Sequence, residues 1–160
     1  MGELWNKISS YNIFNNLLPG ALYVYFIERS SHVVLNSGEI VKDVILYYFI
    51  GLVIGRLGSL IFEPLIIWVR LVRFESYDKY VAACKVDGKI ELLQEIANMY
   101  RTLCIVFIAI IVSLFIITHF TGVTYFFGIY IYAAMFILFS ISYIKQTRYI
   151  VKRVKAAITP

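Results

Sequence analysis

Apolar and polar stretches alternate along this chain of 160 residues in a pattern that suits a membrane. Four stretches are mostly apolar, and each approaches the length of about 20 residues that an α-helix needs to cross the hydrocarbon of a bilayer. They predict spanning helices at about 12–28, 44–70, 103–120 and 123–144. The predicted fold class is therefore all-α, a polytopic membrane protein with one membrane domain over 1–160 and a short cytoplasmic helical extension.

The first stretch is the least regular of the four. Asn12, Asn15 and Asn16 lie in its first turns, and Pro19 interrupts the apolar run. A proline within a span is tolerated when neighbouring groups satisfy the freed carbonyl, so we expect a kinked or broken helix with its amides near one membrane surface. A re-entrant or interfacial segment is the alternative, because the run is near the lower length limit.

The second stretch contains two charges inside its apolar run. Arg56 and Glu63 are seven residues apart, two turns of an α-helix, which predicts that they and Ser59 share one face. A central Arg costs about 2.5–3.5 kcal/mol on insertion scales, so we expect Arg56 to face a partner helix, a polar cavity or water. Pro64 predicts a kink directly after Glu63.

Small residues on the same helix favour close packing with its neighbours. Glycine lets the backbone of another helix approach, as in membrane helix pairs with small residues at their contact. The helix-packing candidates are Gly51, Gly55, Gly58 and Pro64.

The segment at 74–101 is polar and predicts helices outside the membrane. Residues 76–85 form a short amphipathic pattern, and Asp87-Gly88 supplies a turn. From there an amphipathic period leads without a break into the third span, predicting one continuous helix over about 90–120. His119 to Gly122 leaves room only for a tight turn, so the third and fourth spans form an antiparallel hairpin. The tail at 145–160 predicts a basic helix lying on anionic lipid.

The cations are unevenly distributed between the two sides of this topology. Twelve of the fifteen Lys and Arg residues fall on the side that holds the N-terminus, the 74–101 segment and the tail. Cytoplasmic loops carry such an excess, so both termini are predicted to be cytoplasmic (N-in, C-in).

Composition agrees with a membrane protein and offers no enzyme signature. The chain is 61% hydrophobic and 16% charged, against about 45–50% and 25% in soluble domains. It has no phosphate-binding loop, no HExxH zinc motif and no CxxC spacing. We expect no catalytic residues, no metal and no cofactor.

What remains is a polar set at membrane depth and a basic cytoplasmic face. The polar set either lines an ion pathway or gate, or is a buried network that fixes helix register. The basic face, which includes tyrosines, either contacts lipid headgroups or holds a single-stranded nucleic acid or nucleotide. The pore or gate candidates are Arg56, Glu63, Ser59, Asn12, Asn15 and Asn16; the cytoplasmic candidates are Arg70, Arg73, Lys79, Lys85, Lys89, Arg101, Lys145 and Arg148.

Three features together resemble a known group of membrane proteins. These are YNIFNNLLPG at 11–20, the charged and glycine-rich second span, and ANMYRTL at 97–103. In length and layout the chain resembles the four-helix membrane effectors of Hailong-type bacterial anti-phage systems. The resemblance implies a multi-pass protein of the bacterial inner membrane that forms a channel, a tetramer, kept closed by DNA oligomers from a nucleotidyltransferase partner. It assigns no function to any individual residue.

Two functions are consistent with these features. The first is a homo-oligomeric ion channel or membrane-permeabilising effector, gated from the cytoplasm by a nucleic acid or nucleotide. Several copies are expected because four short spans enclose no wide central cavity. The second is a non-catalytic membrane scaffold or accessory subunit that recruits a cytoplasmic partner.

Overall fold

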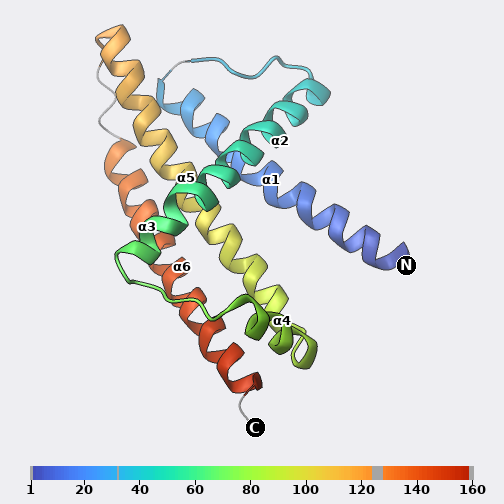
Figure 1. Cartoon of the computed structure of the whole chain (residues 1–160). Coiled ribbons are helices and arrows are strands. Elements are labelled where there is room, and N and C mark those ends of the chain that lie inside the picture. Colours follow the sequence, from blue (N-terminus) through green and yellow to red (C-terminus); the bar gives the residue numbers. More distant parts are fainter. Residues whose placement is uncertain (1, 32, 124–127, 159–160) are drawn as a thin grey trace.

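The computed structural model of the chain describes residues 2–31, 33–123 and 128–158, with no description of the side chains of 2–12 and 14. Every regular element within these ranges is helical (Figure 1). Three helices are long and apolar enough to cross a membrane: Ile40–Trp68, Lys89–Thr121 and Ile129–Ile158. The predicted all-α class is confirmed, and three of the four predicted crossings correspond to these helices.

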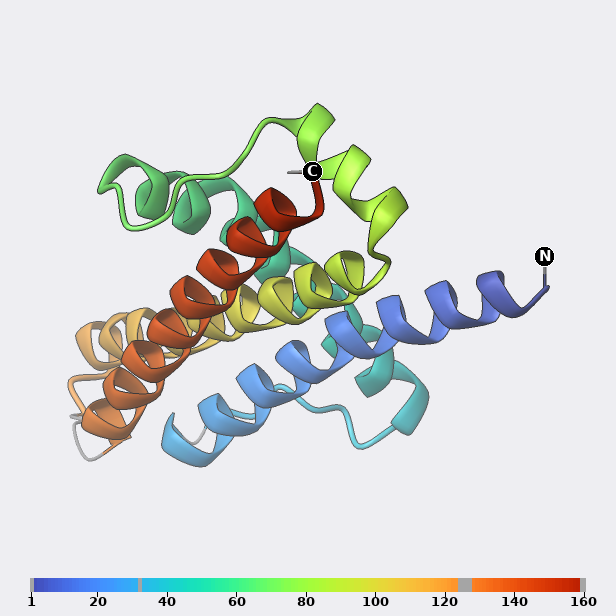
Figure 2. The ribbon, with the colours of Figure 1, turned by 90° about the horizontal axis from the view of Figure 1, so that it is seen from below.

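The first predicted crossing belongs to a longer helix, α1, Gly2–Ser31. It continues through Pro19, so the predicted break is wrong. A proline removes only one backbone donor, and the flanking turns remain helical on both sides. The N-terminal turns of α1 extend away from the other helices in both views (Figures 1 and 2).

The backbones of α1 and α2, Ile40–Leu57, cross in contact at two glycines. A Cβ atom added to Gly20 would lie 1.7 Å from the carbonyl oxygen of Tyr47. One added to Gly51 would lie 1.7 Å from the carbonyl oxygen of Asn16. No side chain fits at either position, so glycine is what permits this crossing.

The second predicted crossing, called the second crossing below, continues from α2 through a π-helical turn, Gly58–Phe62, into α3, Glu63–Trp68. The backbone N–H of Glu63 donates to the carbonyl of Gly58, five residues back. Pro64 follows at once and has no N–H to donate. The predicted irregularity near Pro64 is therefore present as a wider turn.

Helix α5, Lys89–Thr121, is continuous, as the sequence predicts, and it is central to the molecule. It contacts α1, α2, α4, α6 and the π turn. Its fully buried side chains include Val106, Ile110 and Leu114. It ends at Gly122, whose φ of 69° is the left-handed conformation that favours glycine at this position.

Helix α6, Ile129–Ile158, returns antiparallel to α5, and the rings of Phe107 and Phe139 stack between them at 5.7 Å (Figure 1). The predicted start of the fourth span at 123 is too early, because Val123 is not helical; residues 124–127 lie outside the description. The tail is not a separate basic helix. It continues α6 without a break, because its apolar side chains Ile150 and Val154 are buried in the same core.

The short helix α4, Tyr77–Val86, packs on α6 and on the first turns of α5. Together, α4, the start of α5 and the end of α6 form a helical stem at the end of the molecule that holds the C-terminus (Figure 1). Large apolar side chains remain exposed on the second crossing, with Leu60 at 72% and Trp68 at 78%. Such surfaces are expected to be covered by lipid or by another copy of the chain.

Candidate functional site

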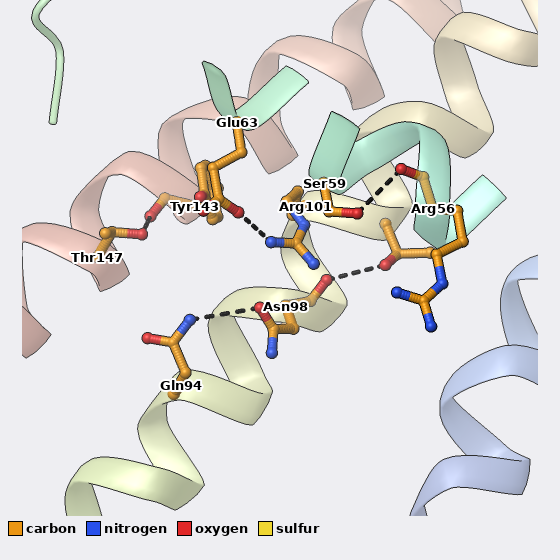
Figure 3. Close-up of polar contacts among 9 residues, drawn as sticks. Arg56, Ser59, Glu63, Gln94, Asn98, Arg101, Tyr143 and Thr147 are labelled. Atoms are coloured by element: carbon orange, nitrogen blue, oxygen red, sulfur yellow. Dashed lines mark hydrogen bonds and ion pairs between the residues drawn. The ribbon is translucent and has the colours of Figure 1, made fainter. Parts of the chain in front are cut away.

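An ion pair joins the end of the second crossing to α5. The guanidinium of Arg101 donates to the carboxylate of Glu63, and both side chains are mostly buried, at 14% and 27% exposure (Figure 3). Tyr143 of α6, which is buried, lies beside the pair. Arg101 was predicted as a cytoplasmic ligand or lipid contact. The structure places it against Glu63 instead, one helix across.

The side chain of Arg101 lies beside Gly58 of the π turn. A Cβ atom on Gly58 would lie 3.4 Å from Cγ and 3.5 Å from Nε of Arg101. That Nε is buried and has no hydrogen-bond partner among the described residues. Arg101 therefore uses one edge of its guanidinium on Glu63 and retains an unused donor.

Arg56 lies near the middle of the second crossing. Ile54 is the central residue of Ile40–Trp68, and Arg56 follows two positions later. Its side chain is exposed, and it forms no ion pair with any described residue. Figure 3 shows its guanidinium pointing away from the Glu63–Arg101 pair.

A polar cavity of about 320 Å³ lies beside Arg56. Its lining comes from α1, from α2 with the π turn, and from α5, so three helices converge on it. It is lined by Asn15, Asn16, Leu52, Gly55, Arg56, Ser59, Asn98, Met99, Arg101 and Thr102.

Two hydroxyl groups of the lining donate to backbone carbonyls. Ser59 donates to Arg56 at 3.0 Å, and Thr102 donates to Asn98 at 2.9 Å. The side-chain oxygen of Asn98 accepts from the amide of Gln94 at 3.3 Å, as Figure 3 shows. The group that Asn98 retains for the cavity is its amide N–H.

The predicted polar set is brought together only in part. Arg56, Ser59, Asn15 and Asn16 share the cavity, whereas the side chain of Asn12 lies outside the description. Glu63 does not line the cavity. The shared face predicted for Arg56 and Glu63 assumed α-helical turns throughout, and the π turn between them alters that spacing.

Asn98 and Thr102 line the cavity but were not predicted from the sequence. They belong to ANMYRTL, where positions 98, 101 and 102 have the i, i+3, i+4 spacing of one helical face. This face meets the second crossing at the start of the apolar run of α5. The helical spacing of these residues could therefore have identified Asn98 and Thr102 from the sequence.

Of the four packing candidates, the three glycines face neighbouring helices and Pro64 does not. Gly51 meets α1, and Gly58 meets Arg101. A Cβ atom on Gly55 would lie 3.9 Å from Oγ1 of Thr102. Pro64 is exposed, just beyond the π turn.

Most of the cytoplasmic candidates have exposed side chains, and two of these are also bonded. Lys79 pairs with Glu75 at 3.1 Å, and Arg148 donates to the carbonyl of Leu71 at 3.0 Å. Two further tail cations, outside the predicted set, bind the stem: Arg153 pairs with Asp87, and Lys155 pairs with Glu75. The candidates whose side chains are exposed are Arg70, Arg73, Lys79, Lys85, Lys89, Lys145 and Arg148.

These ion pairs lower the pKa values of two carboxyl groups, those of Glu75 and Asp87. Hydrogen bonds from Lys79 and Lys155 hold the pKa of Glu75 below its ordinary value. The hydrogen bond from Arg153 does the same for the pKa of Asp87. Burial raises the pKa of Tyr80 to about 12, so its phenol stays protonated at physiological pH.

The chemistry available at the cavity is hydrogen-bond donation and positive charge. Among the described residues, no group of three or more His, Cys, Asp and Glu side chains lies together as a metal site would require. A search for related proteins found no matching family model, no matching curated protein and no matching solved structure.

Proposed function

We propose that the chain forms a homo-oligomeric ion channel whose aqueous path passes the cavity beside Arg56. The observation that carries the proposal is the exposed guanidinium of Arg56 near the middle of a helix long enough to cross a membrane. An arginine there almost always faces protein or water rather than lipid. In a single copy no carboxylate lines the described part of the cavity, so water is the solvent that this charge requires.

We propose an oligomer because the cavity is incompletely enclosed. The three helices around it belong to one copy, and the Arg56 side remains exposed. Large apolar side chains such as Phe49 and Leu60 lie exposed on the same crossing. Closed rotational symmetry would bring equivalent cavities around one axis and bury part of this surface. The resemblance noted above favours a tetramer.

We further propose that α1 makes a fourth crossing and that both termini are cytoplasmic. Tyr23 of α1 hydrogen-bonds Ser113 in the apolar part of α5 at 2.7 Å. Ser30, at the end of α1, hydrogen-bonds Tyr132 near the start of α6 at 2.5 Å. The C-terminal half of α1 thus runs beside two apolar helices. The excess of cations at the stem supports its cytoplasmic location.

Gating is proposed to occur at the stem. Residues 69–76 connect α3, which carries Glu63, to α4, and they include the exposed Arg70 and Arg73. A phosphate-bearing ligand held by these side chains would pull on α3 and so on the Glu63–Arg101 pair. The resemblance proposes DNA oligomers from a nucleotidyltransferase as the ligand, and anti-phage defence at a bacterial inner membrane as the setting.

Salt release from vesicles tests the channel proposal. The purified protein, with its oligomeric mass measured in detergent, is reconstituted into salt-loaded vesicles. Wild type and Lys42→Gln are expected to release salt, while Arg56→Gln changes the rate. Lys42 is the matched control because it lies on α2, exposed and paired with Glu39 at 2.8 Å, away from the cavity. A folded oligomer that releases no salt, with or without DNA oligomers, contradicts the proposal.

A membrane scaffold is the second candidate, and the exposed cations of the stem favour it. Lys85 of α4 and Lys89 of α5 are both exposed and lie on either side of the Asp87-Gly88 turn. A scaffold predicts that Lys85→Ala abolishes capture of a cytoplasmic partner, while Arg56 substitutions only lower stability. A channel predicts that Arg56 substitutions alter flux in a protein that remains folded.

A further inference from the structure

We infer that the cavity beside Arg56 binds small inorganic anions of the halide class and makes the path anion-selective. This inference rests on the proposed channel and adds its selectivity. Arg56 is the residue that determines that selectivity.

The charge of the cavity is positive. Arg56 and Arg101 both line it, whereas Glu63, whose carboxylate is engaged by Arg101, does not line it. The charge of Arg56 is therefore not neutralised by any described residue. A water-filled recess with low-dielectric walls concentrates ions of the opposite sign.

The hydrogen-bonding groups of the cavity include a donor for an anion. Asn98 has its oxygen occupied by Gln94 and offers an N–H. The Nε of Arg101 is buried beside Gly58, where an ion in the cavity does not reach it. The hydroxyls of Ser59 and Thr102 donate to backbone carbonyls, and the amides of Asn15 and Asn16 each carry both an N–H donor and a carbonyl oxygen.

Size supports a small, partly hydrated ion. A volume of about 320 Å³ corresponds to about ten waters at the ~30 Å³ that each occupies in the liquid. A monovalent anion with several waters fits this space. A cation would meet the positive charge of Arg56, which forms no ion pair with any described residue.

The first arm of the test measures selectivity. Wild type in planar bilayers under a potassium chloride gradient should give a reversal potential that favours chloride. Arg56→Lys keeps the charge and should keep that sign. Arg56→Gln should lower the ratio of chloride to potassium permeability, and Arg56→Glu should lower it by at least about tenfold. Potassium selectivity in wild type, or a ratio unchanged in Arg56→Gln, overturns the inference while leaving a channel in place.

The second arm detects the ion without requiring current. Crystals grown in detergent and transferred to sodium bromide should show anomalous density beside Arg56 in wild type and none in Arg56→Gln. Bromide density in a protein that conducts no ions would leave the anion site standing and overturn the channel. A phospholipid headgroup occupying the cavity, or no bromide there in wild type, overturns the anion site.

Discussion

Glu63 and Arg101 are 38 positions apart in the sequence and form an ion pair that fastens α3 to α5. The Arg101 side chain lies at van der Waals distance from the position where a Cβ on Gly58 would be. Glu63 follows directly after the π turn, which sets the direction in which its side chain points. One local irregularity in the second crossing thus determines both this pair and the separate location of Arg56.

Removing one partner of this pair should destabilise the fold. Glu63→Gln or Arg101→Gln should each lower the free energy of unfolding by about 2 kcal/mol, less than for a fully buried pair because water reaches both groups. The double change Glu63→Leu with Arg101→Leu should recover more than half of that loss, since no unpaired charge remains. Unfolding in mixed detergent micelles measures both. Additive losses in the double variant would argue against a coupled pair.

The glycines at the crossing of α1 and α2 should not tolerate alanine. Gly51→Ala and Gly20→Ala each place a methyl group 1.7 Å from a backbone oxygen of the other helix, so α1 must separate from α2. We expect a large drop in the thermal unfolding midpoint. Gly88→Ala is the matched control, because nothing lies within 4 Å of its Cβ position and its φ of −61° suits any residue. Equal effects at the three sites would refute this geometry.

Removing a single hydroxyl group tests whether α1 packs on the central helix, α5. Tyr23→Phe removes the hydrogen bond to Ser113 and should lower the free energy of unfolding by about 0.6 kcal/mol, the mean for such bonds between membrane helices. Tyr130→Phe should have no effect, since Tyr130 is 81% exposed. If Ser113→Ala and Tyr23→Phe prove independent in a double-mutant cycle, the two hydroxyls are not bonded.

Lowering the pH should weaken the contacts that hold α4 in the stem. Glu75 and Asp87 have lowered pKa values in the folded protein, so their contribution is present above their ordinary pKa values and is lost as pH falls through the folded-state values. Hydrogen exchange in α4, corrected for its intrinsic pH dependence, should accelerate below about pH 4. A double variant, Glu75→Gln with Asp87→Asn, should exchange faster at pH 6 and respond less to acid. If neither the acid nor the double variant alters the exchange rate, packing alone holds α4 in place.

Long-period patterns were predictable from the sequence, whereas the local irregularity near Pro64 was predicted as a kink and is a π turn. The unbroken apolar and amphipathic periods identified the three helices that could cross a membrane and the continuity of α5. The tail was misjudged because its cations suggested a lipid surface, while the burial of Ile150 and Val154 keeps it on the core.

The candidate site shows the same limit. Arg56 was identified because a charge in an apolar run is conspicuous, and Ser59 lies with it. The relation of Arg56 to Glu63 was mispredicted because the π turn has no clear sequence mark besides Pro64. Arg101 was assigned to the cytoplasm because it precedes the apolar run, and only the three-dimensional contact reveals that Glu63 neutralises it.

Single-channel recording on the purified oligomer tests most directly whether the chain conducts ions past Arg56. Protein of measured mass, fused into planar bilayers of neutral lipid, should give discrete current steps. Arg56→Gln should change their amplitude, and Lys42→Gln should leave it unchanged. Silence from a correctly folded oligomer, with and without DNA oligomers or nucleotides on the stem side, would contradict the channel; steps of equal size in all three proteins would contradict a path past Arg56.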